Sequence, residues 1–397
     1  MPGVRSVAIG AWVRAASLHE PRDRMGVSHL LEHMVFKGTN RRSAHEIALS
    51  LEALGGSLDA YTSREHTVYQ GRVLDEHLTE AADVIGDIVL HPTLRESDLA
   101  LERKVILEEI GMVEDTPDDL VFELHNELLW GDHPYGYSIL GTRDTVGALS
   151  TQDLKDLHGR AYFPANCVIA AAGNLEHDRL LDELGKQGWF EDRETGKGKR
   201  ETPSAAQITP GVRGAQARHV KDTAQTHIVF ATDSVRYADR RKYALLVLAN
   251  VFGGGMSSRL FQRIREELGL AYAIYSFTSF YRGVGMTGVY VGTQPARAEK
   301  AVEAIRGEFA RMAQDGLRGE ALADAKQQTL GQLMLSLESP TARMYRLAST
   351  AVYSEPYRSL DDVLRTVEAL TADEVSAVAR EFFDPDRQTV VSLGPKP

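Results

Sequence analysis

The stretch that most constrains this chain is His29-Leu30-Leu31-Glu32-His33, an H-x-x-E-H pattern inside SHLLEHMVFKGT. If the run is helical, His29 and His33 lie one turn apart on the same face, and Glu32 borders that face. Two neutral imidazoles suit Zn²⁺, and a carboxylate beside them suits a general base. The pattern predicts a metal-binding helix, although alone it also fits chance or a solvated helix face.

Composition limits the classes of protein that the chain can represent. Its 397 residues favour two domains over a single core. A hydrophobic content of 43% and a charged content of 25% are globular values. No apolar run reaches the length of about 18 residues that spans a membrane, so we expect no membrane partner. The net charge of −11 disfavours nucleic acid as a partner.

The N-terminus and the single cysteine bear on the cellular compartment. The start, MPGVRSVAIGAWVRAAS, lacks the layout of a signal peptide, which favours a cytoplasmic protein or a start trimmed of its leader. Cys167 is the only cysteine, which excludes an intrachain disulfide and a cysteine-based zinc site. It lies in NCVIAAAG, a pattern typical of a buried strand, so we expect an inert thiol.

The first half of the chain alternates expected strands and helices. Strands are expected at 6–15 and, paired with each other, at 57–63 and 66–74. Ser43 with Glu46 forms a capping box before a helix. A further helix is expected within 95–115, beginning near Ser97. In that helix, Glu102 and Glu109 are two turns apart and share a face, whereas Glu108 and Glu114 are expected to be solvated.

The second half repeats the order of the first. QTHIVFATDS parallels VRSVAIGAWVR, RKYALLVLANVFGGG parallels the H-x-x-E-H helix, and SRLFQRIREELGLAYAIYSF parallels IALSLEALGGSLDAYTS. A repeat at about 200 residues indicates domain duplication. We expect domains at 1–190 and 214–397, joined by a polar linker at 191–213. The second copy lacks the H-x-x-E-H pattern, so we expect it to supply substrate contacts.

Four stretches in order resemble the pitrilysin/insulinase family of inverted-motif zinc peptidases: HLLEHMVFKGT, GGSLDAYTSREHTVY, LERKVILEEI and SSRLFQRIREELGLAYAIYS. The chain is most similar to short bacterial members and to the β-subunit of mitochondrial processing peptidase. The resemblance covers nearly the whole chain. It implies an α+β fold of two homologous sandwich-like domains, each a mostly antiparallel sheet covered by helices, which together form a clamshell.

The resemblance also implies the metal site. His29, His33 and Glu109, which follows His33 by 76 residues, match the ligands of one Zn²⁺ per chain. Glu32 matches the general base, and Glu102 matches a carboxylate that supports the site. Co²⁺ or Mn²⁺ also suits such a set of ligands. No fourth protein ligand has suitable spacing; the candidates nearest in sequence are His45 and His66.

In the second half, the resemblance implies an arginine and a tyrosine that reach the substrate. These match Arg263 and Tyr272, with Arg265 as an alternative because the R-x-R sequence leaves the alignment open by two positions. Both arginines also fit a solvated helix face, and Tyr272 also fits a residue that packs within a sheet.

The strand at 57–62, with Asp59, Ala60 and Tyr61, is implied to pair with the substrate backbone. The family usually has Asn where this chain has Asp59, and we hypothesise that Asp59 shifts preference toward basic residues. The family also usually begins one strand before M-P-G-V, so that strand is absent here or the start is trimmed.

The expected function is that of a zinc endopeptidase or oligopeptidase, which hydrolyses peptides enclosed between two domains through a metal-activated water. Having both the zinc motif and the arginine and tyrosine of the second half in one chain favours a homodimer, and a paralogous partner chain is the alternative. The competing function is a non-catalytic peptide-binding or core/assembly subunit. The presence of His29, Glu32, His33 and Glu109 argues against that role.

Overall fold

The computed structural model describes residues 1–190 and 211–396, which form two compact units. The first unit combines residues 1–112, the described part of 137–204, and 336–357. The second combines residues 113–136 with the described parts of 205–335 and 358–397. Each unit therefore includes one segment from the other half of the sequence. The predicted linker at 191–213 lies mostly outside the described residues, and the predicted domain boundaries stay a prediction.

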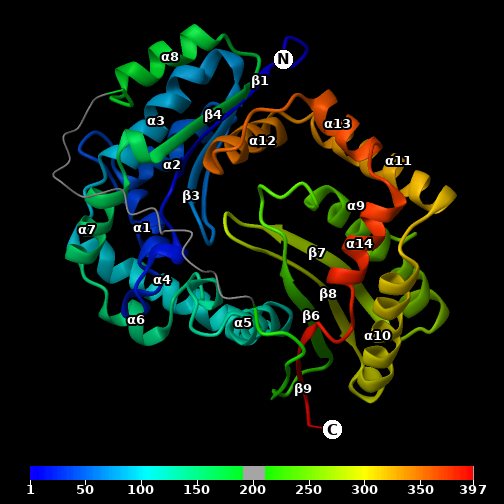
Figure 1. Cartoon of the computed structure of the whole chain (residues 1–397). Coiled ribbons are helices and arrows are strands. Elements are labelled where there is room, and N and C mark those ends of the chain that lie inside the picture. Colours follow the sequence, from blue (N-terminus) through cyan, green and yellow to red (C-terminus); the bar gives the residue numbers. More distant parts are fainter. Residues whose placement is uncertain (191–210, 397) are drawn as a thin grey trace. The chain divides into compact units, whose positions relative to one another are not determined.

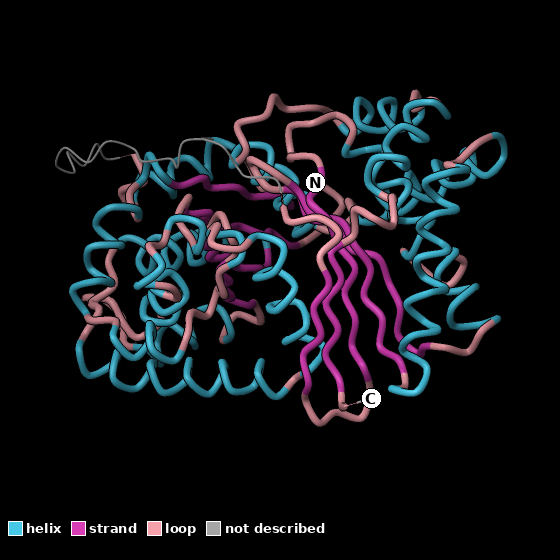
Figure 2. The backbone as a smooth tube through the Cα atoms, turned by 60° about the horizontal axis from the view of Figure 1, so that its bottom comes forward, coloured by secondary structure: helices cyan, strands magenta, loops and turns pink. Residues whose placement is uncertain are grey.

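The first unit is built on a four-stranded antiparallel sheet in the order β2-β3-β1-β4. Figure 1 labels three of its strands, and Figure 2 shows the strands of both units in magenta. Its strands are β1 (Ser6–Val13), β2 (Ser57–Thr62), β3 (Thr67–Leu74) and β4 (Cys167–Gly173). The expected pairing of the strands at 57–63 and 66–74 is confirmed, with Ser57 opposite Arg72 and Thr62 opposite Thr67.

Side chains alternate across this sheet, so each face has its own core. On one face, Val7 and Ile9 of β1 pack in the main core with helices of the first half. Those helices are α1 (Val27–Val35), α2 (Ala44–Glu52), α3 (Leu78–Leu90), α4 (Glu96–Asp115), α6 (Arg143–Ala148), α7 (Thr151–Ala161) and α8 (His177–Lys186). The predicted capping box of Ser43 and Glu46 begins α2.

The opposite face of this sheet is covered by α12 (Pro340–Val352), from the last quarter of the chain (Figure 1). Trp12 of β1 and Met344 of α12 are both buried in this smaller core. The ring of Trp12 contacts that of Tyr345 edge-on, with 5.6 Å between centroids. The first sheet is thus enclosed on both faces.

The second unit contains a five-stranded sheet in the order β5-β9-β6-β8-β7, antiparallel except for the pair β5 and β9. Its strands are β5 (Gln216–Val220), β6 (Thr226–Ser234), β7 (Ala271–Phe280), β8 (Gly285–Thr293) and β9 (Thr389–Gly394). Most of its helices pack against one face, and these are α9 (Lys242–Gly253), α10 (Ala298–Asp315), α11 (Gly319–Ser336), α13 (Leu360–Glu368) and α14 (Ala372–Phe382).

The other face of the second sheet packs against α5 (Pro117–Trp130), which comes from the first half of the sequence (Figure 1). Phe122 of α5 stacks on Tyr290 of β8, with 5.7 Å between ring centroids. His125 of α5 lies 3.0 Å from the carbonyl oxygen of Thr389 in β9. Thus α12, from the second half of the sequence, belongs to the first unit, and α5, from the first half, belongs to the second unit. We call these two the exchanged helices.

The order β2-β3-β1-β4 in the first sheet matches β7-β8-β6-β9 in the second, which agrees with the predicted duplication. The predicted α+β fold, with two similar domains of mostly antiparallel sheet covered by helices, is confirmed. The clamshell arrangement stays a prediction. One difference is local: the segment matching α2 forms a π-helical turn, Phe261–Glu267.

Two further expectations concern membrane contact and the cysteine. In the described ranges, no helix has both the length and the apolar character needed to cross a bilayer. Cys167 begins β4 and is partly buried. Burial raises the pKa of its thiol to about 12, so the thiol stays protonated at neutral pH and is a weak nucleophile.

Candidate metal centre

The H-x-x-E-H pattern lies on α1, and the start of this helix is fixed by a buried carboxylate. Glu20 accepts hydrogen bonds from the backbone N–H groups of Gly26 and Ser28, both at 2.8 Å. Burial raises the pKa of Glu20, and these hydrogen bonds oppose the shift. Gly26 has a φ of +88°, and a Cβ there would lie 2.5 Å from the carbonyl oxygen of Leu140. The turn into α1 therefore requires glycine.

The structure brings His29, His33 and Glu109 together. Nε2 of His29 lies 3.7 Å from Oε2 of Glu109, and Nε2 of His33 lies 3.7 Å from Oε1 of the same carboxylate. One donor atom from each residue lies within 4.8 Å of the others. Two imidazoles and a carboxylate are the donors found in catalytic zinc sites. Burial, together with the neighbouring His33, lowers the pKa of His29 to about 4, so its imidazole is neutral, as a ligand must be.

Neither histidine proposed as a fourth ligand joins this cluster. Across the described ranges, His29, His33 and Glu109 form the one group of three or more residues with metal-ligating geometry. His45 is exposed on α2, and His66 is largely buried next to the ring of Tyr61. A set of three protein ligands leaves coordination positions for water or substrate, which is the arrangement of catalytic zinc sites.

Glu32 lies beside the ligands without joining them. It is 8% exposed, and its Oε2 accepts a hydrogen bond of 2.5 Å from the hydroxyl of Thr62 at the end of β2. Burial raises the pKa of Glu32, and the Thr62 hydrogen bond opposes that shift. A base whose pKa is raised toward the working pH suits proton transfer. The sequence prediction missed Thr62, because nothing in the sequence shows that the end of β2 lies beside Glu32.

Glu102 lies on the same side of α4 as Glu109 and contacts a ligand. Its Oε2 is 3.1 Å from Nδ1 of His33, and its Oε1 is 2.7 Å from the ammonium of Lys37. The sequence prediction included Glu102 but not Lys37. His29 has no such support, since its Nδ1 is buried without a hydrogen-bond partner among the described residues.

Asp59, Ala60 and Tyr61 lie on β2, at the edge of the first sheet. An edge strand offers backbone N–H and C=O groups to an added strand. The ring of Tyr61 stacks against that of Tyr345 on α12, with 6.2 Å between centroids, and Asp59 is exposed.

Arg263, Arg265 and Tyr272 belong to the second unit. Arg263 donates a hydrogen bond of 2.5 Å to Glu267, one turn along. Arg265 pairs with Glu266 at 3.6 Å, and its guanidinium carbon lies 4.5 Å from the ring centroid of Phe261. It also lies 4.7 Å from the ring centroid of Tyr272, a residue that is 77% exposed. The geometry therefore favours Arg265 as the partner of Tyr272. Their approach to the metal ligands stays a prediction.

Comparison with known proteins agrees with this fold. Residues 1–143 match the family described as Insulinase (Peptidase family M16), and residues 148–329 match the Peptidase M16 inactive domain. The chain is 39% identical to the uncharacterized zinc protease YmxG of Bacillus subtilis, over 97% of this chain and 92% of that protein. It is 36% identical to an uncharacterized zinc protease of Streptomyces coelicolor, over 100% of this chain and 86% of that protein.

Two solved structures share the fold. One is a peptidase M16 inactive domain from Pseudomonas fluorescens, with a TM-score of 0.88 at 22% identity, covering 99% of this chain and 94% of that one. The other is a protease from Helicobacter pylori, with a TM-score of 0.89 at 20% identity, covering 98% and 94%. Fold and site thus define a two-domain protein of the zinc-protease type. The chain belongs to the M16 (insulinase) peptidase family, which confirms the resemblance seen in the sequence.

Proposed function

We propose that this chain is a zinc-dependent endopeptidase that hydrolyses peptides or unfolded segments. The observation that carries the proposal is the convergence of His29, His33 and Glu109 beside Glu32, a buried carboxylate outside the ligand set. A subunit that only binds peptides or assembles a complex has no need of a base next to three metal ligands.

Each residue has a defined role in this proposal. His29, His33 and Glu109 would hold the zinc, which when bound would supply Lewis-acid activation of a water molecule and of the scissile carbonyl. Glu32 takes a proton from the attacking water and returns it to the nitrogen of the leaving amine. The hydroxyl of Thr62 keeps Oε2 of Glu32 engaged, so Oε1 is the oxygen available for the proton. Glu102 orients the imidazole of His33.

Substrate binding is assigned to the edge strand β2. We propose that an extended peptide adds to its free edge, beside the exposed carboxylate of Asp59. A carboxylate at this position attracts basic side chains. Asp59→Asn should therefore weaken a preference for Lys or Arg near the cleavage site, which cleavage of a peptide library would measure. An unchanged preference would refute this part of the proposal.

The remaining roles concern the second unit and the assembly. We propose that Tyr272 and a neighbouring arginine contact the substrate, with the Tyr272 hydroxyl donating a hydrogen bond to the developing oxyanion. We also propose a homodimer and a cytoplasmic location. Sedimentation of the purified chain and cell fractionation test these two points.

The direct test of the function is hydrolysis of a mixed pool of quenched peptides by the purified chain. Cleavage should stop when a chelator removes the metal and return when zinc is restored. Cleavage that persists in the chelator would contradict a metal-dependent mechanism. Absence of cleavage by a chain with zinc bound would favour a peptide-binding role or a requirement for a partner chain.

A further inference from the structure

We propose that Lys37 is a positioning residue of the metal centre, which holds Glu102 and through it the imidazole of His33. This inference rests on the proposed function, because it concerns how the zinc ligand is oriented. It adds a residue from the loop after α1 to the ligands and to Glu102.

The contacts form a chain of three side chains. Nε2 of His33 faces Glu109, so a metal-binding imidazole carries its proton on Nδ1. That Nδ1–H donates to Oε2 of Glu102 at 3.1 Å, and the ammonium of Lys37 lies 2.7 Å from Oε1. Both oxygens of the carboxylate are thus engaged, and its plane is fixed from two sides.

The burial of these groups makes the ammonium necessary. The side chain of Glu102 is 8% exposed and that of His33 is 19% exposed. A buried carboxylate is costly unless a cation or several donors compensate it, and Lys37 supplies the cation here. Lys37 itself is 34% exposed, so its own desolvation is limited. Without it, Glu102 would be free to turn away from His33 toward water.

The backbone carbonyl groups of Lys37 and Gly38 are both held by hydrogen bonds from the segment before α4. Arg95 donates to the carbonyl oxygen of Lys37 at 2.7 Å, and the backbone N–H of Thr93 donates to the carbonyl oxygen of Gly38 at 3.0 Å. Gly38 has a φ of +138°, where side chains are strongly disfavoured. The chain turns sharply directly after Lys37, and the turn is fixed.

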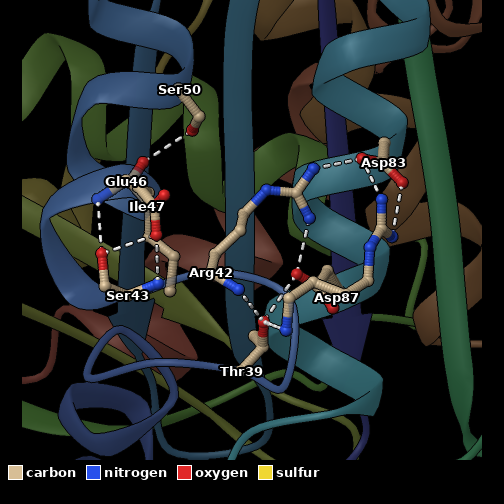
Figure 3. Close-up of polar contacts among 9 residues, drawn as sticks. Thr39, Arg42, Ser43, Glu46, Ile47, Ser50, Asp83 and Asp87 are labelled. Carbon is tan, nitrogen blue, oxygen red and sulfur yellow. Dashed lines mark hydrogen bonds and ion pairs between the residues drawn. The ribbon is translucent and has the colours of Figure 1, made fainter.

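The rest of the loop is fixed to α3 by a buried polar network (Figure 3). The hydroxyl of Thr39 donates to Asp87 at 2.8 Å, and Arg42 donates to the same oxygen at 2.6 Å. Asp87 is 1% exposed, and Arg42 also pairs with Asp83. A loop held in this way presents the Cα of Lys37 in one place, so binding of its ammonium to Glu102 costs side-chain entropy but no further backbone entropy.

The experiment measures zinc affinity by competition with a chromophoric chelator, in the full chain. Lys37→Met should weaken zinc binding about 10-fold, and Glu102→Gln about 10- to 100-fold. The double variant should bind zinc as Glu102→Gln does, because Lys37 acts only through Glu102. Lys37→Arg, which keeps the charge, should recover most of the affinity. The d–d spectrum of the Co²⁺ form should change in Lys37→Met.

The matched control is Lys186→Met. Lys186 pairs at 2.8 Å with Glu183, a carboxylate whose side chain is 9% exposed, in the same unit but on α8. This variant removes the same kind of pair and should leave zinc affinity unchanged. Circular dichroism checks that each variant is folded, and Lys37→Gln takes the place of Lys37→Met if the latter is not.

Three results would overturn the inference. Lys37→Met could bind zinc with wild-type affinity, or the double variant could lose affinity by the product of the two single losses. Lys186→Met could also lose as much zinc affinity as Lys37→Met. Each leaves the proposed function standing. A parent chain that binds no zinc would instead overturn the proposed function, and this inference with it.

Discussion

At the scale of single residues, the metal centre depends on side chains outside its recognisable motif. Glu20 fixes the start of α1, Thr62 holds Glu32, and Lys37 holds Glu102. Glu20 acts through two hydrogen bonds to backbone N–H groups, whereas Thr62 and Lys37 each act through one contact with a buried carboxylate. Removing such a partner leaves a buried polar group unsatisfied, which costs more than the bond itself contributes.

Thr62→Val tests the contact with the general base. Valine keeps the shape of threonine but cannot donate to Glu32, whose carboxylate then loses a charge-assisted hydrogen bond. We expect kcat to fall about 10-fold or more while zinc affinity stays unchanged. Thr350→Val is the matched control, because the hydroxyl of Thr350 on α12 donates to the backbone carbonyl oxygen of Arg346 at 3.0 Å and does not contact Thr62. Equal losses of kcat in both variants would contradict the role of Thr62.

The sequence leaves open whether Arg263 or Arg265 contacts the substrate, and alanine variants of both distinguish the two possibilities. Arg265 packs on Tyr272, whereas Arg263 is engaged with Glu267. We therefore expect Arg265→Ala to lower kcat/KM about 10-fold or more and Arg263→Ala to change it little. Steady-state kinetics on one quenched peptide make the comparison. The reverse order would restore Arg263 as the substrate arginine.

At the scale of elements, each sheet is completed by a helix from the other half of the chain. Helix α12 covers the first sheet and α5 covers the second. A sheet with a large exposed apolar face is unstable in water, so each unit needs its exchanged helix to fold. Contacts of these helices should therefore control the stability of the unit they join.

Met344→Ala tests the contribution of α12. Met344 is fully buried against the first sheet, in the cluster that includes Trp12. The substitution should lower the free energy of unfolding by about 2–5 kcal/mol, measured by urea denaturation. Met256→Ala is the control, since Met256 is 74% exposed and should change nothing measurable. Similar midpoints for the two variants would show that α12 does not stabilise the unit.

The contact of α5 with the second sheet should make stability depend on pH. Burial lowers the pKa of His125 to about 4, although the carbonyl groups of Thr389 and Ala231 oppose the shift. Between the ordinary value of 6.5 and this value, the unfolded chain binds more protons than the folded chain. Stability is therefore complete above about pH 6.5 and falls as the pH drops toward 4, by about 3 kcal/mol at most from this residue.

Urea denaturation at several pH values in that range, with a chelator present throughout, measures this loss. His125→Gln keeps a donor for the Thr389 carbonyl but does not titrate. Its stability should fall less steeply on acidification than that of the parent chain. Parallel curves for the two proteins would exclude His125 as a source of the pH dependence.

At the scale of the whole molecule, the sequence predicted the fold class and the duplication but not the exchange of helices. The strands β1, β2 and β3 and the duplication could be anticipated, because alternation and the repeat of the pattern can be seen in the sequence itself. Periodicity in α5 and α12 shows that one side of each helix is buried, but not which sheet buries it. The sequence around Met344 and Phe122 does not show which sheet each side chain packs against.

Some residues of the candidate site could likewise be predicted from the sequence, and others could not. His29, Glu32 and His33 were predictable from one helical turn, and Glu102 and Glu109 from their spacing on α4 and the family resemblance. Thr62 and Lys37 were not, because their importance comes from contacts between elements. Such contacts depend on packing geometry, which no single stretch of sequence encodes.

The measurement that tests the central claim most directly is the zinc content and peptide turnover of Glu32→Gln beside the parent chain. The substitution keeps the size of the side chain and spares the ligands His29, His33 and Glu109 but removes the base. We expect the variant to hold one zinc per chain and its turnover to fall by about 100-fold or more. A variant that retains the parental rate with zinc bound would contradict the assignment of Glu32 and the proposed mechanism.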